Sequence, residues 1–301
     1  MQTRNRKLSW LLLGGMCAVI AAAVTWGMWR ELQTQKLDRD LIAAINISDV
    51  GATQSLLGRG ANPNISTASQ HDATLWSLLL KRIFRVTPLH HGTPALILAV
   101  TKLQSTDDDK IGSERGLAVV KALLEYGAYV DSEDEEGRNV IHTAMKSPDA
   151  VPILRLALQY RLPIRPSHGV QQALLLDRKE PIDGLTPLMV ASLWGGPEEI
   201  TLLLEAGANV DLQSNDGKTA VMLAVEKARP ENIACLLAHH ANLQLTDRHG
   251  NTALSMALSS ESSNAVTPFN HEAGDDFWPK IVLMLKRAGI KTHREGILHS
   301  N

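Results

Sequence analysis

Residues 183–211 read DGLTPLMVASLWGGPEEITLLLEAGANVD, and this stretch decides the fold. Thr186 stands where a side chain can cap a helix, and Pro187 suits the first helical turn, where no amide partner is lost. Leu188 and Ala191 share one face of that helix, and the small Ala191 lets a neighbouring helix approach. The first half of the stretch therefore predicts a short, capped helix.

The second half of the stretch predicts another helix. Gly195 is placed to end the first helix, residues 200–204 are apolar apart from Thr201, and Gly207 supplies the positive φ that closes a helix. These residues serve packing and chain reversal, and none of them is a catalytic group. We therefore expect a helix–turn–helix unit without chemistry of its own.

This unit recurs at a fixed interval. The landmarks that return are Gly184, Gly217 and Gly250, spaced 33 residues apart; Thr186, Thr219 and Thr252; and Gly207-Ala208-Asn209, which returns as His240-Ala241-Asn242. The pattern resembles the ankyrin repeat, a unit of about 33 residues with a tight turn, two antiparallel helices and an outward loop. Because one repeat cannot bury its apolar face alone, such units stack. The resemblance implies an all-α solenoid of about six repeats over residues 39–291.

The other repeats are less regular. Residues 39–65 resemble a truncated first repeat, and the second repeat restarts at 93–96 with its second helix expected at 117–126. In the third repeat Asn139 stands where the family has threonine, which predicts a weaker helix start. The last repeat breaks at Ser259, resumes at 280–288 and is followed by an expected tail.

Insertions separate several of these units. They comprise residues 66–92, 104–116, 166–180 and 259–279, and their role is left open. Within the first insertion, residues 72–84 have helical spacing and a possible aspartate cap, so a helix is expected there. Loop insertions in repeat proteins either line a binding edge or are simply tolerated.

The N-terminus has the pattern of a membrane anchor. Residues 8–29 carry no charge and would span roughly 33 Å as a helix, enough to cross a bilayer core. Tryptophan lies near both ends of this run, and residues 1–7 are basic. We expect an inner-membrane protein with a cytoplasmic N-terminus, one transmembrane helix at 8–29, a linker at 30–38, a periplasmic solenoid at 39–291 and a tail at 292–301.

Three alternatives to this anchor stay open. A signal peptide could be cleaved after the small residues 21–23, although apolar sequence continues to Trp29. Lipid attachment at Cys17 is disfavoured, because Met16 stands where such sites need a small residue. Initiation at Met16 or Met28 would shorten or remove the anchor and leave a cytosolic solenoid.

Composition argues against several classes of function. Beyond the first 30 residues, 26 basic side chains stand against 32 acidic ones, which disfavours nucleic acid as a partner. The chain has 2 cysteines, too few for a disulfide framework, and lacks the common nucleophile, phosphate-loop and zinc motifs. Asp107–Asp109 and the histidine pairs at 90–91 and 239–240 lack metal-site spacing. We therefore expect no catalysis, no cofactor and no metal.

The resemblance places the partner-binding surface on the outward loops and the exposed face of the first helices. The positions carried over are Glu135, Glu136, Arg138, Ile182, Asp183, Leu185, Leu193, Trp194, Asn215, Asp216, Lys218, Glu226, Lys227, Arg248, His249 and Asn251. Trp194 beside Leu193 and Leu185 has the composition of an interface anchor. The alternative is that Trp194 only covers the adjoining repeat.

The architecture suggests two functions. Membrane-tethered bacterial ankyrin proteins facing the periplasm resemble immunity proteins that neutralise secreted antibacterial toxins, such as phospholipase effectors of type VI secretion. Such an inhibitor would bind one protein partner, possibly a lipase-type toxin, at about 1:1. The alternative is a scaffold or adaptor that organises an envelope complex without inhibiting anything.

Overall fold

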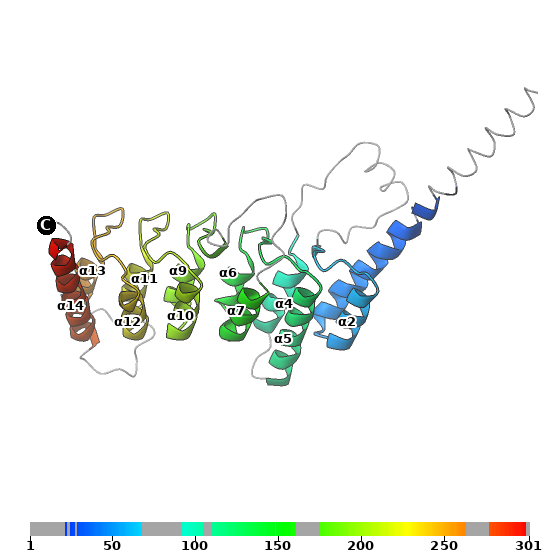
Figure 1. Ribbon diagram of the computed structural model, residues 1–301, viewed down its shortest axis with the longest axis horizontal. Coiled ribbons are helices and arrows are strands. Elements are labelled where there is room, and N and C mark those ends of the chain that lie inside the picture. The colour runs from blue at the N-terminus through cyan, green and yellow to red at the C-terminus, as the bar shows by residue number, and fades with distance from the viewer. Residues whose placement is uncertain are drawn as a thin grey trace, which may run out of the picture.

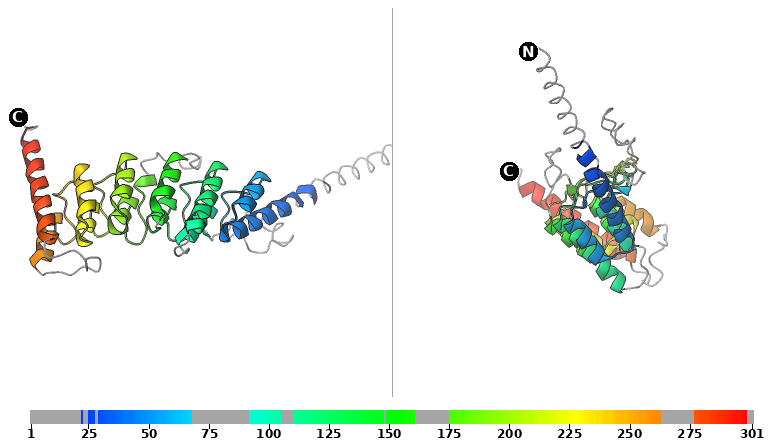
Figure 2. Two further views of the ribbon diagram at one scale, coloured as in Figure 1. Left: turned by 90° about the horizontal axis from the view of Figure 1, so that it is seen from below. Right: turned by 90° about the vertical axis from the view of Figure 1, so that its right-hand side faces the viewer.

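The computed structural model describes residues 22, 25–27, 29–67, 92–104, 110–147, 149–160, 175–262 and 277–298. A first helix covers residues 29–46. The further helices are α2 (Val50–Gly58), α4 (Ala95–Gln104), α5 (Lys110–Glu125), α6 (Val140–Ala144), α7 (Ala150–Gln159), α9 (Pro187–Trp194), α10 (Pro197–Glu205), α11 (Ala220–Glu226), α12 (Pro230–Ala238), α13 (Ala253–Ser262) and α14 (Phe277–Leu298). Within the described ranges they form six consecutive pairs, stacked in one row (Figure 1; Figure 2). The expected helical solenoid is confirmed.

Side chains cap the first helices as the sequence predicts. The backbone N–H of Met189 lies 3.4 Å from the Thr186 hydroxyl oxygen at the start of α9, and Met222 makes the same contact with Thr219 in α11. The weaker helix start predicted at Asn139 is wrong. The Asn139 side-chain oxygen Oδ1 accepts from the N–H groups of both Ile141 and His142 at 3.0 Å, because asparagine caps a helix as well as threonine does.

The outward loops, here called the finger loops, comprise residues 131–138, 177–185, 211–218 and 244–251. Each ends in a tight turn that contains a glycine at positive φ, namely Gly137, Gly184, Gly217 and Gly250. In the turn before α11, the Ser214 N–H donates to the Lys218 carbonyl at 2.9 Å, and the Gly217 N–H donates back to Ser214. The turn is therefore closed by its own backbone.

Successive finger loops are joined to one another. The Asn215 N–H donates to the Asp183 carbonyl at 3.0 Å, and the Arg248 N–H donates to the Asp216 carbonyl at 3.0 Å. Carboxylates add a second set of bonds nearer the helices, since Asp211 accepts from the Asn242 N–H at 2.8 Å. The constant interval of the landmarks follows, because each loop must meet its neighbour in the same register.

Several predicted boundaries are wrong. Helix α5 begins at Lys110 rather than at residue 117, because the polar tract before residue 117 forms its first turns. Helix α13 continues past Ser259 to Ser262. Helix α14 runs to Leu298 through the expected tail, because Gly289 remains helical and lacks the positive φ that ends a helix at Gly207.

Other predictions lie wholly or partly outside the described residues. These are residues 8–21, 23, 24 and 28 of the expected anchor, the helix at 72–84, the aspartates at 107–109 and most of the insertions. Among the residues that are described, no helix has both the length and the apolar character needed to cross a membrane. The expected linker at 30–38 is helical, as part of the helix at 29–46.

The finger-loop packing predicts unequal effects for two Gly→Ala substitutions. At Gly184 (φ 67°) an added Cβ would lie 2.3 Å from the Asn215 side-chain oxygen and 2.7 Å from its backbone nitrogen. At Gly207 (φ 98°) the Cβ would meet nothing within 4 Å. We expect Gly207→Ala to lower the free energy of unfolding by about 1 kcal/mol from backbone strain, and Gly184→Ala by about 3 kcal/mol from strain plus overpacking. Urea denaturation measures both, and equal losses would contradict the account.

Candidate protein-binding surface

The structure places most of the sequence-predicted positions on one accessible surface. The exposed positions are Glu135, Glu136, Ile182, Asp183, Trp194, Asn215, Asp216, Glu226, Arg248 and His249. Half-buried positions are Arg138, Leu185, Lys218, Lys227 and Asn251. They come from the finger loops before α6, α9, α11 and α13 and from the C-terminal ends of α9 and α11, which lie next to each other in the stack (Figure 1).

Leu193 is the exception and requires a correction. It was expected on the exposed face, but only 9% of its surface is accessible, and it belongs to the core. Helix α9 is buried from Pro187 to Leu193, because it packs between α6, α11 and its own partner α10. A helix surrounded on three sides leaves its solvent contact to its last residue, Trp194.

Trp194 lies at the junction of the fourth and fifth repeats. Half of its surface (51%) is accessible. The Lys227 ammonium, from the next repeat, lies 4.9 Å from the centroid of the Trp194 ring, within the range of a cation–π contact. The ring therefore contacts the adjoining repeat and also presents an aromatic surface to solvent, and its role as an interface anchor stays a prediction.

Ion pairs hold several charged positions of this surface. The Lys218 ammonium lies 2.6 Å from a Glu226 carboxylate oxygen, which joins a finger loop to the end of α11. Arg138 contacts Asp134 at 2.8 Å and Glu136 at 2.9 Å, and the Asp134 side chain is almost inaccessible. Because exposed pairs contribute little to stability, these pairs serve mainly to orient the loop side chains.

His142 joins the third and fourth repeats from inside. Its ring is fully buried, with Nδ1 2.9 Å from the Asn139 side-chain oxygen and Nε2 3.3 Å from the Leu185 carbonyl oxygen in the next finger loop. The ring therefore contacts the backbone of the neighbouring finger loop. Burial lowers the pKa of His142 to about 4, so the ring is neutral at pH 7.

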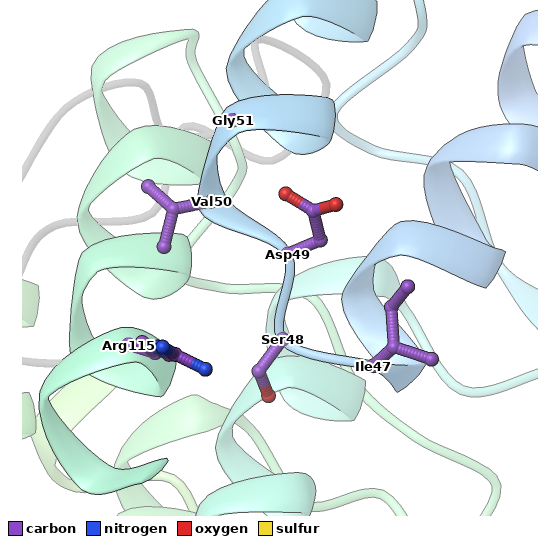
Figure 3. Close-up of a pocket in the computed structure, with 6 residues that line it drawn as sticks. All are labelled: Ile47, Ser48, Asp49, Val50, Gly51 and Arg115. Atoms are coloured by element: carbon purple, nitrogen blue, oxygen red, sulfur yellow. The ribbon is translucent and has the colours of Figure 1, made fainter. Parts of the chain in front are cut away.

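Sequence reasoning missed one hollow at the other end of the array. An open pocket of about 400 Å³ is lined by Ile47, Ser48, Asp49, Val50, Gly51 and Arg115 (Figure 3). Ser48 has a positive φ of 52°, which turns the chain between the first helix and α2. A serine at this position does not indicate such a turn in the sequence. The Asp49 carboxylate already caps α2 by accepting from the Ala52 N–H at 2.9 Å. The charged groups that line the pocket are therefore the Arg115 guanidinium and the Asp49 carboxylate, which is already bonded as a helix cap. This pair does not form a catalytic arrangement.

Comparison with known families decides the classification. The family model described as ankyrin repeats (3 copies) matches residues 111–214 and 188–274. The chain belongs to the ankyrin-repeat family. Ankyrin repeats bind proteins, and the fold is typically a non-catalytic binding scaffold. Across the described part of the chain, no group of three or more histidine, cysteine or acidic residues could hold a metal ion.

Known proteins resemble this ankyrin array over different lengths. The human transient receptor potential cation channel subfamily A member 1 is 33% identical over 98 residues, which cover 33% of this chain and 8% of the channel. The ankyrin repeat domain of Bcl-3, a member of the IkappaB family, superposes with a TM-score of 0.56 at 22% identity, covering 83% of this chain and 86% of that domain. An ankyrin repeat domain from Acinetobacter baumannii gives a TM-score of 0.54 at 21% identity, with 83% and 97% covered. The two structures support the fold alone.

The buried ring of His142 predicts a pH-dependent stability. Its pKa is about 4 when folded and about 6.5 when unfolded, so the stabilisation is complete above pH 6.5 and is lost as the pH falls towards 4. We expect this group to remove about 3 kcal/mol from the free energy of unfolding over that interval. Urea denaturation at several pH values gives the free energy of unfolding as a function of pH. The slope of this free energy against pH should be shallower for His142→Gln than for the wild type. His249→Gln, at an exposed loop tip, should keep the wild-type slope, and a loss of slope there would contradict the assignment.

Proposed function

We propose that this ankyrin array binds one protein partner through its finger loops and Trp194, and that it acts as an immunity protein that inhibits a secreted antibacterial toxin such as a phospholipase effector. The observation that carries the binding surface is the accessible pair of large apolar side chains on one repeat. Ile182 is 75% exposed at the tip of its finger loop, and Trp194 is 51% exposed at the end of the helix that follows.

Charged residues lie on the finger loops next to Ile182, and Lys227 lies against Trp194. Asp183 and Asp216 are exposed on the same and the next finger loop, and Glu135 and Glu136 are exposed on the preceding one. Buried aromatic anchors inside a polar rim are the usual composition of a protein interface. The backbone bonds between finger loops support tight binding, because loops that are already ordered lose little conformational freedom when a partner docks.

We propose in addition that residues 8–29 tether the chain to the inner membrane, with the array in the periplasm. The support is the uncharged run of 22 residues with basic residues before it. A tether would confine the array to the compartment that an envelope-targeted toxin enters. Alkaline extraction of cell membranes tests this part, since a chain released into the soluble fraction would contradict the tether while leaving the binding surface untouched.

The inhibitor and the scaffold differ in stoichiometry and effect. An inhibitor forms a complex of about 1:1 and abolishes the activity of its partner, whereas a scaffold leaves that activity intact. Deleting the gene should make cells more sensitive to a toxin delivered by neighbouring cells. Unchanged sensitivity to every competitor, together with an active enzyme in the complex, would replace the inhibitor by the scaffold.

Substitutions on the proposed surface should separate binding from stability. We expect Trp194→Ala to weaken partner binding by about 30-fold, or about 2 kcal/mol, because it removes a central aromatic anchor. Asp183→Arg should weaken it further by reversing a rim charge. Pull-down from native membranes followed by titration calorimetry measures both effects.

The matched control is Glu205→Arg, which reverses an exposed charge on α10 that is not among the proposed surface positions. It should leave binding unchanged. If the partner binds both Trp194→Ala and Asp183→Arg as tightly as the wild type, the proposed surface is wrong.

A further inference from the structure

An exposed aromatic pair lies at the start of the described chain. Residues 25–27 and 29–46 are helical, and Trp26 and Trp29 are 66% and 54% exposed. Their ring centroids are 5.4 Å apart, with the ring planes inclined by 33°, so the two indoles form one continuous patch on one side of the helix. A tryptophan side chain offers roughly 150–250 Å² for burial, and two such rings facing water are costly unless something covers them.

The chemistry of the patch fits the headgroup region of a lipid bilayer. Indole combines a flat apolar body with one N–H donor, and tryptophan is enriched where the apolar core of a membrane meets water. The sequence changes from uncharged to charged at this point, because residues 8–29 carry no charge and Arg30 and Glu31 follow directly. A protein partner would explain exposed tryptophans equally well, but it would not explain why they lie at this change of polarity.

The helix that carries the pair is firmly joined to the array. Leu41, Ile42 and Ile45 are buried in the core of the first repeat, and Leu37 packs against it. One turn closer to the tryptophans, the Asp38 carboxylate accepts from the Asn62 N–H at 2.7 Å, which ties the helix to the exit loop after α2. Residues 29–36, here called the stalk, precede this point and are helical and mostly exposed.

We infer that Trp26 and Trp29 lie in the headgroup region of a bilayer and that the stalk holds the array at a fixed height and rotation above it. The inference rests on the proposed membrane tether. The nine steps along the helix from Trp29 to Asp38 span about 14 Å. Because residues 29–46 are one helix, the array cannot turn independently of the aromatic pair without breaking helical hydrogen bonds. The helix is visible as the long blue element beside α2 (Figure 1).

Fluorescence quenching tests the position of the pair. The full chain is placed in vesicles of phosphatidylcholine and phosphatidylglycerol, with Trp10→Phe and Trp76→Phe as background. One chain keeps Trp26 and Trp29, and a reference chain carries Trp26→Phe and Trp29→Phe, so both retain Trp194 and Trp278. We expect the additional fluorescence of the first chain to be lost mainly with lipids brominated near the headgroup.

Each other outcome contradicts a defined part of the scheme. If both chains sediment with the vesicles but the additional fluorescence is not quenched, the aromatic pair is not in the membrane and the inference fails while the tether stands. If quenching is strongest with lipids brominated deep in the acyl chains, the headgroup assignment is wrong. If neither chain associates with vesicles, the tether itself fails and the inference fails with it.

Insertions into the stalk test the fixed height. Arg59→Cys, on a background of Cys17→Ser and Cys235→Ser, carries a donor dye, and labelled lipid headgroups carry the acceptor. A helix-forming insertion of seven residues after Gln35 keeps the rotation and should reduce energy transfer, because it lengthens the stalk by about 10 Å. A flexible insertion of equal length should broaden the distribution of distances between the donor dye and the labelled headgroups. Unchanged transfer with the helical insertion, or equal distributions for both insertions, would overturn the fixed stalk.

Discussion

A backbone hydrogen bond from one finger loop to the next fixes the geometry of the regular half of the array, where it recurs between the last three finger loops. The Asn215 N–H reaches the Asp183 carbonyl and the Arg248 N–H reaches the Asp216 carbonyl, each at 3.0 Å. The bond requires two backbones to approach closely, and at Gly184 a side chain would occupy the space of Asn215. The interval between repeats, the glycines in the turns and the alignment of the helices below them all follow from this one contact.

The same contact explains why this surface suits recognition. Loops that are bonded to each other present Ile182 and the surrounding carboxylates in a fixed arrangement, and the helices beneath present Trp194 beside Lys227. Two buried polar groups of the third and fourth repeats hold neighbouring residues in place. His142 is neutral and bonded to backbone, and Asp134 holds Arg138. The polar interior therefore serves to position the loops, and the chemistry of recognition is left to exposed side chains.

Structural features that are decided by a few adjacent residues could be predicted from the sequence. Features that depend on the packing of neighbouring helices could not. Thr186 and Thr219 cap their helices and Gly207 closes one, because capping and positive φ are decided within a few residues. The start of α5 and the length of α14 were missed, since a polar tract and a glycine are equally compatible with helix or loop. Leu193 was misplaced, because its burial depends on which helices flank α9.

Helix α6, between Asn139 and Met145, has five residues, the fewest among the described helices. In a stack where each repeat touches only its neighbours, bending concentrates at the joint with the smallest packed area. The third repeat therefore offers its neighbours the shortest first helix among the described repeats, and the buried ring of His142, which reaches the Leu185 carbonyl, adds a polar contact across that joint.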